Sequence, residues 1–197
     1  MNRLFLYTLV LAVMAGCRST VHNSQGKTLL PALPRPSHWA ASVEIAGVNN
    51  CHILDKNLFR SAQPTEKGFA ELQKMGIKSV LCLRTGWSDV YPARNTMLKC
   101  RRISMLAWKI SDENIIDALR ILNNPAQGPF LVHCLHGSDR TGAVCAAYRI
   151  VLQNWSKEEA IAEMTKGGYG YHKMFSNIVN YLNGMDVEKI RSQVQKK

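Results

Sequence analysis

The stretch PFLVHCLHGSDRTGAVCAAYRIVLQ, residues 129–153, combines two structural patterns on either side of a short polar loop. Residues 130–132 are apolar and include an aromatic ring, as expected of a strand buried in the centre of a sheet. From residue 142 onward, small and apolar side chains recur at helical spacing. The stretch therefore predicts a strand, a loop and a helix in succession, which is where α/β proteins bind ligands.

The loop between this strand and this helix carries a cysteine and an arginine, Cys134 and Arg140. Backbone N–H groups of such a loop lack internal partners and can converge on an anion, aided by the helix dipole. These N–H groups, Arg140 and the Thr141 hydroxyl would stabilise a Cys134 thiolate and so lower its pKa. The planar guanidinium of Arg140 can bind two phosphate oxygens at once. A nucleophilic cysteine beside this arginine predicts attack on a phosphate ester.

The neighbouring residues are candidates for supporting roles. His133 either hydrogen-bonds the backbone near the thiolate or merely packs at the strand end, and His136 either lines the pocket mouth or is an exposed loop residue. Asp139 would repel phosphate if it faced inward, so we expect it to point outward and brace the loop. Arg60 is expected to buttress the site through a salt bridge. The predicted phosphate-binding loop comprises Leu135, His136, Gly137, Ser138, Asp139 and Arg140.

HCLHGSDRTG, residues 133–142, resembles the HCx5R signature loop of cysteine-dependent protein tyrosine and dual-specificity phosphatases. Two further stretches, NLFRSAQPT at 57–65 and GGYGYH at 167–172, resemble compact bacterial exported tyrosine phosphatases related to atypical dual-specificity enzymes of plants and fungi. The resemblance spans residues 48–191 and implies the dual-specificity-phosphatase fold. It also implies a two-step reaction through a phosphocysteine on Cys134, with no cofactor and no metal ion.

Strand-like and helix-like patterns alternate beyond residue 42, which predicts an α/β architecture. The resemblance implies a short, mostly parallel central sheet flanked by helices on both faces. Strands are expected around residues 48–54, 77–83, 102–106 and 130–133. Helices are expected at residues 65–75, 113–122, 140–153 and 157–166, with one or two more from residue 174 onward.

Expulsion of the alcohol or phenol needs a proton, so an acid should face the loop from another segment. Asp112 lies 22 residues before Cys134, after a strand, where the acid loop of this family normally sits. We therefore expect Asp112 to be the general acid. The alternative is helix capping, because Ser111, Asp112 and Glu113 open a predicted helix. Glu113 and Asp89 are the reserve candidates for the acid.

The chain begins MNRLFLYTLVLAVMAGCRST, a basic start followed by an apolar stretch and small residues before Cys17. This pattern is typical of a secretion signal, which we assign to residues 1–16. A membrane-spanning helix is the alternative, but it needs roughly 20 apolar residues. The small residues before Cys17 resemble the lipobox of bacterial lipoproteins, whose cysteine is acylated. Met14 departs from the preferred leucine, which leaves cleavage to a soluble exported protein open.

Residues 17–41 are first polar and then rich in proline, which suits an extended tether. The alternative is packing on the domain through Leu29, Leu30 and Trp39. We expect the catalytic domain at residues 42–191 and a polar tail at 192–197. The protein is predicted to be exported, either as a periplasmic protein or as an envelope lipoprotein anchored to the membrane through Cys17.

The charge and the loop sequence bear on the partner. The chain has 25 Lys and Arg against 14 Asp and Glu, a net charge of +11, which favours anionic partners. Export and the lack of zinc-finger or RNA-binding sequence patterns argue against nucleic acid. Leu135 and Ser138 stand where basic residues would help bind inositol pyrophosphates, which favours phosphotyrosine, or phosphoserine and phosphothreonine, on a protein. The remaining alternatives are an inositol polyphosphate or pyrophosphate phosphatase, a phosphoprotein-binding pseudoenzyme, and arsenate reductase or rhodanese-like chemistry.

Overall fold

The computed structural model describes residues 21–22, 28–29 and 35–196. The expected signal peptide, Cys17 and most of the expected tether lie outside the described residues. The chain divides into two compact units, Met1–Pro34 and Arg35–Lys197. The first contains the short antiparallel pair β1 (Val21–His22) and β2 (Thr28–Leu29).

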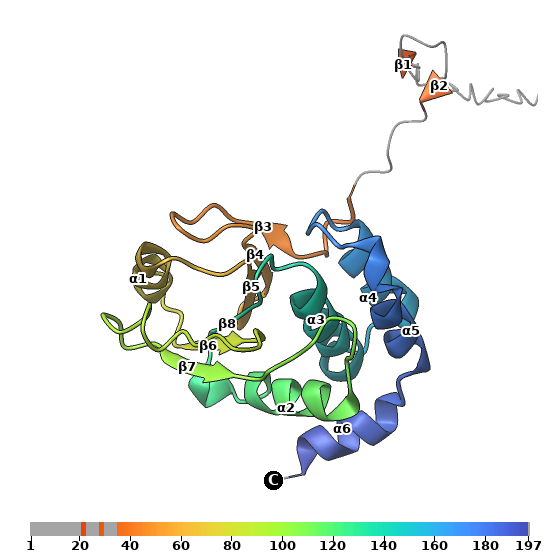
Figure 1. The fold of residues 1–197 in the computed structure, drawn as a ribbon. Helices are drawn as coiled ribbons and strands as arrows, with labels where there is room; N and C mark the ends of the chain where they lie inside the picture. Colours follow the sequence, from red (N-terminus) through yellow and green to blue (C-terminus); the bar gives the residue numbers. More distant parts are fainter. Residues whose placement is uncertain (1–20, 23–27, 30–34, 197) are drawn as a thin grey trace, which may run out of the picture. The chain divides into compact units, whose positions relative to one another are not determined.

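A six-stranded sheet forms the centre of the second unit (Figure 1), with the strand order β3-β4-β5-β8-β6-β7. Three pairs are parallel, β5–β8, β8–β6 and β6–β7, whereas β3–β4 and β4–β5 are antiparallel. This sheet confirms the expected mostly parallel α/β architecture. Its strands are β3 (Ala41–Ser42), β4 (His52–Asp55), β5 (Leu58–Ser61), β6 (Ser79–Cys82), β7 (Lys99–Arg102) and β8 (Phe130–His133).

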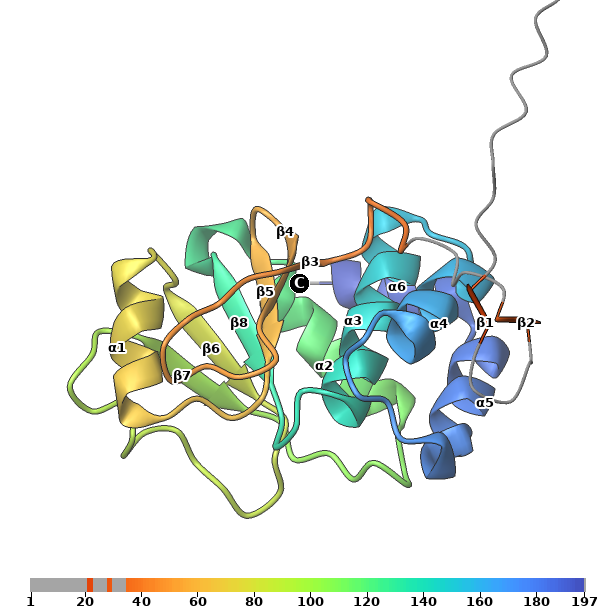
Figure 2. The same ribbon diagram turned by 90° about the horizontal axis from the view of Figure 1, so that it is seen from above.

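Helices cover both faces of the sheet, with α1 on one face and the other α-helices on the opposite face (Figure 2). Alternate residues of the central strands supply the two cores. Val80 and Leu131 pack in the core beside α1, while Leu81 and Val132 pack in the larger core with α2 and α3. The helices are α1 (Glu66–Lys74), α2 (Asp112–Leu122), α3 (Asp139–Gln153), α4 (Lys157–Lys166), α5 (Ser176–Gly184) and α6 (Val187–Gln195), with 3-10 turns η1 (Pro125–Gln127) and η2 (Lys173–Phe175).

Serine and threonine side chains set the starts of three helices. Thr65, Ser111 and Ser156 each accept a hydrogen bond from the backbone N–H three residues later, at the starts of α1, α2 and α4. Such caps satisfy N–H groups that have no partner within the helix. The local sequence therefore predicts these helix starts within a residue or two.

The strands were predicted less completely than the helices. The strand expected at 102–106 lies at 99–102 as β7, and β5 was not expected at all. β7 is an edge strand with mostly exposed side chains, so its sequence carries little apolar signal. β5 contains the buried polar residues Arg60 and Ser61, which interrupt the apolar pattern of a central strand.

The domain boundaries differ from the expected ones at both ends. The second unit begins at Arg35, because this residue binds the backbone oxygen of Gly167 at 3.2 Å and the hydroxyl of Tyr169 at 2.9 Å. Residues 35–41 therefore pack on the domain rather than forming tether. The expected polar tail is also wrong for residues 192–195, because α6 extends to Gln195 and buries Val194. In the described part of the chain, no helix has both the length and the apolar character needed to cross a bilayer.

Candidate active site

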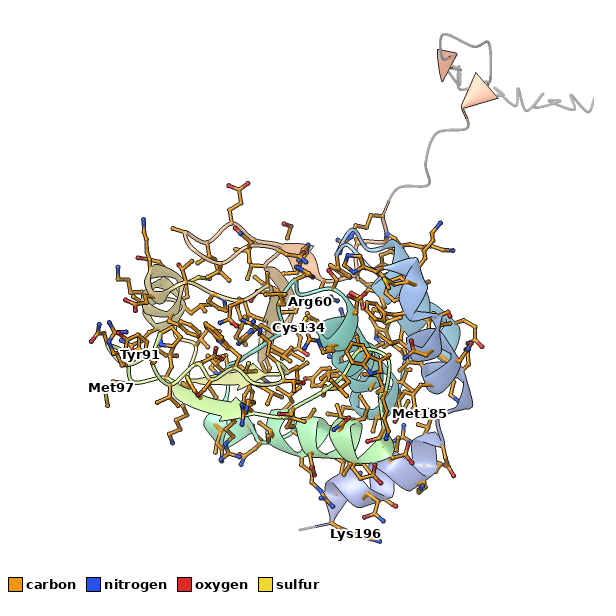
Figure 3. All side chains as sticks on the ribbon, in the orientation of Figure 1. Arg60, Tyr91, Met97, Cys134, Met185 and Lys196 are labelled. Carbon is orange, nitrogen blue, oxygen red and sulfur yellow. The ribbon has the colours of Figure 1, made fainter. Side chains whose placement is uncertain are left out.

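Cys134 directly follows β8, which lies between β5 and β6 in the sheet. The neighbouring strands end at Ser61 and Cys82, and both of these residues pair with His133. The loop that joins Cys134 to α3 therefore leaves the sheet at the carboxyl edge of its parallel strands, where open α/β sheets bind ligands. The Cys134 side chain lies in the interior of the unit, 3% exposed (Figure 3).

Hydrogen bonds from His133 and from three residues distant in the chain hold the backbone carbonyl groups of residues 134–137. The donors are His133 Nδ1 to Cys134 O at 3.0 Å, Gln63 N to Leu135 O at 3.1 Å, Asn50 Nδ2 to His136 O at 2.9 Å and Arg60 Nη2 to Gly137 O at 2.7 Å. Within the described residues, no N–H group of residues 135–140 donates to a backbone oxygen. These N–H groups, at the start of α3, are free to bind an anion.

The surroundings of the Cys134 thiol lower its pKa. Burial by itself raises its pKa, but hydrogen bonds from the Thr141 hydroxyl and from the N–H groups of Thr141 and Gly137, together with the charge of Arg140, lower the pKa below its usual value. The Thr141 hydroxyl is buried and has no hydrogen-bond partner elsewhere in the described part of the chain, so it remains available to a Cys134 thiolate. A lowered pKa makes the nucleophilic form of the cysteine available near neutral pH.

Gly137 lets the loop pack against the end of β5. Its φ is +74°, in the left-handed region that favours glycine. A Cβ atom at this position would lie 2.5 Å from the backbone oxygen of Ser61 and 2.6 Å from the backbone nitrogen of Ala62. Both the backbone conformation and the close approach therefore require glycine.

Arg60 braces the loop from β5. Its guanidinium lies 3.7 Å from the centre of the Tyr169 ring and donates to the Gly137 carbonyl, and the side chain is 1% exposed. Ser138 Oγ also donates to the Tyr169 carbonyl, at 2.8 Å. The buttress that we expected is present, but Arg60 acts through a carbonyl group and an aromatic ring rather than through a salt bridge with a described carboxylate.

His133 and Asp89 form a buried ion pair behind the loop. The Nε2 atom of His133 lies 2.7 Å from Asp89 Oδ2, and Gln63 Nε2 donates to Asp89 Oδ1 at 3.0 Å. Burial opposes protonation of the ring, but the hydrogen bonds and charges of Asp89 and Cys82 raise the His133 pKa to about 10. Both ring nitrogens therefore carry protons and donate. Asp89, a reserve candidate for the acid, is fully engaged here.

The same three side chains are the candidates for metal binding among the described residues. The ligand atoms of Cys82, Asp89 and His133 lie within 4.8 Å of one another. A histidine must be deprotonated at the nitrogen that binds a metal. Because Asp89 holds His133 in its protonated form, the cluster fits a hydrogen-bond network better than a metal centre.

Arg140 lines a cleft of about 450 Å³ beside the loop. Nη1 of Arg140 has two long contacts, at 3.5 Å, with the carbonyl oxygens of Leu83 and Met105. The remaining N–H groups of the guanidinium make no hydrogen bond within the described part and can bind two oxygens of a phosphate. The cleft is lined by Thr85, Met105, Leu106, Ala107, Trp108, His136, Asp139, Arg140, His172, Met174 and Phe175.

Three titratable side chains besides Arg140 line this cleft, namely His136, Asp139 and His172. His136 is exposed, while Asp139 is buried and ties the loop to the segment 167–172. Asp139 accepts hydrogen bonds from the backbone N–H of His172 at 2.9 Å and from its Nδ1 atom at 2.8 Å. Asp139 thus braces the loop, as expected, although it also contributes to the lining of the cleft.

Asp112 and Glu113 lie elsewhere. The Asp112 carboxylate accepts hydrogen bonds from the hydroxyl of Tyr181 at 3.0 Å and from the ammonium of Lys189 at 2.9 Å. Neither Asp112 nor Glu113 lines the cleft beside Arg140. The prediction that Asp112 faces the loop therefore has no support in the structure. Its carboxylate instead connects the start of α2 to α5 and α6.

Asn50, Gln63 and His172 had no predicted role at the site. Asn50 and Gln63 orient loop carbonyls, Tyr169 stacks on Arg60, and His172 binds Asp139. Gln63, Tyr169 and His172 fall within the two stretches that carried the resemblance, 57–65 and 167–172. The resemblance of those two stretches to the family could therefore have indicated that these residues serve the site. Their contacts with the loop, however, depend on tertiary structure.

Comparison with known proteins agrees with this geometry. A model described as the tyrosine phosphatase family matches residues 45–192. The dual specificity protein phosphatase TpbA of Pseudomonas aeruginosa is 33% identical over 165 residues, covering 81% of this chain and 72% of TpbA. The inositol diphosphatase SIW14 of Saccharomyces cerevisiae is 32% identical over 120 residues, covering 55% of this chain and 41% of that protein.

Solved structures of phosphatases also superpose on this chain. The crystal structure of Pseudomonas aeruginosa TpbA in complex with phosphotyrosine superposes with a TM-score of 0.74 at 30% identity, covering 83% of this chain and 99% of TpbA. The catalytic core of Siw14 superposes with a TM-score of 0.66 at 23% identity, covering 77% of this chain and 93% of that core. The second likeness concerns the fold alone.

Proposed function

The chain belongs to the tyrosine phosphatase family, and we propose that it hydrolyses phosphotyrosine through a phosphocysteine on Cys134. The observation that carries this proposal is the arrangement of the loop around the sulfur. Backbone N–H groups without backbone partners, the Arg140 guanidinium and the Thr141 hydroxyl surround a thiol of lowered pKa. These groups can stabilise the charge on a phosphoryl group as it moves from the tyrosine oxygen to the Cys134 sulfur and then to a water oxygen.

The reaction has two steps. The Cys134 thiolate attacks phosphorus, the P–S bond forms, and the P–O bond to the tyrosine breaks as its oxygen takes a proton. Water then attacks phosphorus, the P–S bond breaks, and inorganic phosphate leaves while the thiolate is restored. Arg140 and the loop N–H groups stabilise the negative charge on the phosphoryl oxygens in both steps.

The lining of the cleft favours an aryl phosphate on a protein. Leu106, Trp108, Met174 and Phe175 form an apolar border beside Arg140, and three of them are exposed large side chains. Such a border can pack against the phosphotyrosine ring and neighbouring apolar residues. The same cleft admits phosphoserine and phosphothreonine, which we keep as further substrates.

An inositol pyrophosphate is the second candidate, because a curated relative carries the name inositol diphosphatase. This ligand has many negative charges and needs several cationic partners. Among the residues that line the described cleft, Arg140 is the one arginine, and there is no lysine. Leu135 and Ser138 add no charge to the loop. The charge of the cleft therefore favours the phosphoprotein.

The test is hydrolysis of a phosphotyrosine peptide and of an inositol pyrophosphate by the purified chain, with reductant and a chelator present. We expect phosphate release from the peptide and none from Cys134→Ser. Acid quenching during turnover followed by mass spectrometry should find phosphate on Cys134. Faster turnover of the inositol pyrophosphate would reverse the order of the substrates, and peptide binding without turnover would indicate a pseudoenzyme.

We further propose that the protein acts outside the cytoplasm, on the grounds of the amino-terminal sequence alone. The apolar segment before Cys17 supports export, and Cys17 supports a lipid anchor. The phosphorylated partner would then be a protein of the cell envelope.

A further inference from the structure

Breaking the bond to tyrosine requires a proton donor, and the acidic residues expected in this role are engaged elsewhere. Asp112 binds Tyr181 and Lys189, and Asp89 binds His133 and Gln63. No aspartate or glutamate occurs from residue 90 to residue 111, the segment that contributes Met105 to Trp108 to the cleft. The proton must therefore come from another residue at the cleft.

Asp139 is the carboxylate among the residues that line the cleft, but it is poorly suited to donate. Its Oδ1 atom accepts the backbone N–H of His172, and its Oδ2 atom accepts Nδ1–H of the same residue. Both carboxylate oxygens are therefore occupied by His172, and Asp139 serves to position that residue.

His172 has the features of a donor. The two hydrogen bonds to Asp139 fix its backbone and its ring together, and the ring also packs edge-on against Phe175 at a centroid distance of 6.3 Å. Its side chain is 48% exposed, whereas that of Asp139 is 9% exposed. With Nδ1 bound to the carboxylate, Nε2 is left without a partner in the described part of the chain, and His172 is one of the residues that line the cleft.

Charged groups of both signs lie around the His172 ring. Asp139 contributes a buried carboxylate in direct contact with Nδ1. The cations and titratable groups nearby are Arg140, His136, whose ring centre lies 5.8 Å away, and the adjacent Lys173. A substrate phosphate would add negative charge to the same cleft. His136 lacks a carboxylate partner within the described residues and is an exposed loop side chain.

We propose that His172, positioned by Asp139, is the general acid. In the first step, Nε2–H of the imidazolium protonates the tyrosine oxygen as the P–O bond breaks, which leaves neutral His172. In the second step, Nε2 takes a proton from the attacking water as the P–S bond breaks, which restores the imidazolium. The inference rests on the proposed phosphatase function and assigns the proton transfer within it.

The test compares His172→Asn with the matched variant His136→Asn on two aryl phosphates. Phenolate leaves poorly and needs the proton, whereas 4-nitrophenolate leaves well without it. We expect His172→Asn to lower kcat/KM, which reports the first step alone, by about 100-fold for phenyl phosphate and by much less for 4-nitrophenyl phosphate. His136→Asn should change both by the same factor.

Three results would overturn the assignment. One is an equal loss on both substrates in His172→Asn when its thermal unfolding midpoint matches that of the wild type. Another is selective loss on phenyl phosphate in His136→Asn or in Asp112→Asn instead. The third is His172→Asn with wild-type rates on both substrates. A wild-type chain that hydrolyses neither ester would reject the phosphatase function itself, a result distinct from these three.

Discussion

His133 and Asp89 form an ion pair in which the Nε2 and Oδ2 atoms lie 2.7 Å apart, and both side chains are almost completely buried. His133 belongs to the strand that leads into Cys134, whereas Asp89 lies in the loop between β6 and β7. The other nitrogen of the His133 ring holds the carbonyl of Cys134. The pair therefore fixes the position of the Cys134 backbone.

Asp89→Asn should destabilise the fold by about 3–5 kcal/mol, because it leaves a charged ring buried without its partner. The pH dependence follows from the raised pKa of His133, about 10. The stabilisation is complete below the usual histidine pKa of about 6.5 and is lost as the pH rises through about 10. Urea unfolding should therefore give a lower free energy of unfolding at pH 10 than at pH 6 in the wild type, and a smaller difference between the two pH values in the variant.

Asp117→Asn is the matched control for that experiment, because Asp117 is an exposed residue of α2. It should change stability by no more than about 0.5 kcal/mol. An Asp89→Asn protein as stable as this control at pH 6 would contradict the role of the pair.

Thr141→Ala should raise the pKa of the Cys134 thiol, because it removes a hydrogen bond to the thiolate. Loss of a hydrogen bond to a charged group costs about 1.5–3 kcal/mol, so kcat/KM near pH 6 should fall roughly tenfold or more. The pH dependence of alkylation by iodoacetamide measures the thiol directly. Burial raises the pKa of Cys51, Cys100 and Cys145 to about 11, so these thiols stay protonated below pH 8.

Thr141→Ser keeps the hydroxyl and is the control for the thiol measurement. Its alkylation profile should coincide with that of the wild type. If Thr141→Ala also coincides with the wild type, the hydroxyl does not act on the sulfur.

Gly137→Ala should lower activity by at least 100-fold, because a methyl group would push the loop away from Ser61 by a distance that matters for phosphate positioning. Gly76→Ala is the matched control. Gly76 also has a positive φ, of +88°, but a Cβ atom there meets nothing within 4 Å. Both variants should lose about 1 kcal/mol of stability from backbone strain, Gly137→Ala should lose more because of the contact with Ser61 and Ala62, and Gly137→Ala alone should lose activity. Equal activity in the two variants would show that the close approach is unimportant.

Cys17→Ser tests the proposed lipid anchor. Cells grown with radiolabelled palmitate should label the wild-type protein and not the variant, and the variant should move from the membrane to the soluble envelope fraction. An unlabelled wild-type protein in the soluble envelope fraction would favour ordinary cleavage instead.

Local sequence predicted the elements that local interactions stabilise. The apolar run before Cys134 became β8 and the pattern after Gly142 became α3. The caps of α1, α2 and α4 each join residues three positions apart, so they can be predicted from the local sequence. β5 was missed because Arg60 is buried there by its contacts with Gly137 and Tyr169, and the residues of these contacts lie far away in the chain.

The sequence by itself predicted the α/β class, from the alternation of strand and helix patterns beyond residue 42, and the strand–loop–helix order around Cys134 and Arg140, from residues 129–153. Only the tertiary structure decided which residues serve the loop. Asp112 has the spacing expected of the acid, but Tyr181 and Lys189 hold it elsewhere, and His172 meets Asp139 although 33 positions separate them. Such contacts arise from the packing of whole helices and strands, and spacing along the chain does not encode them.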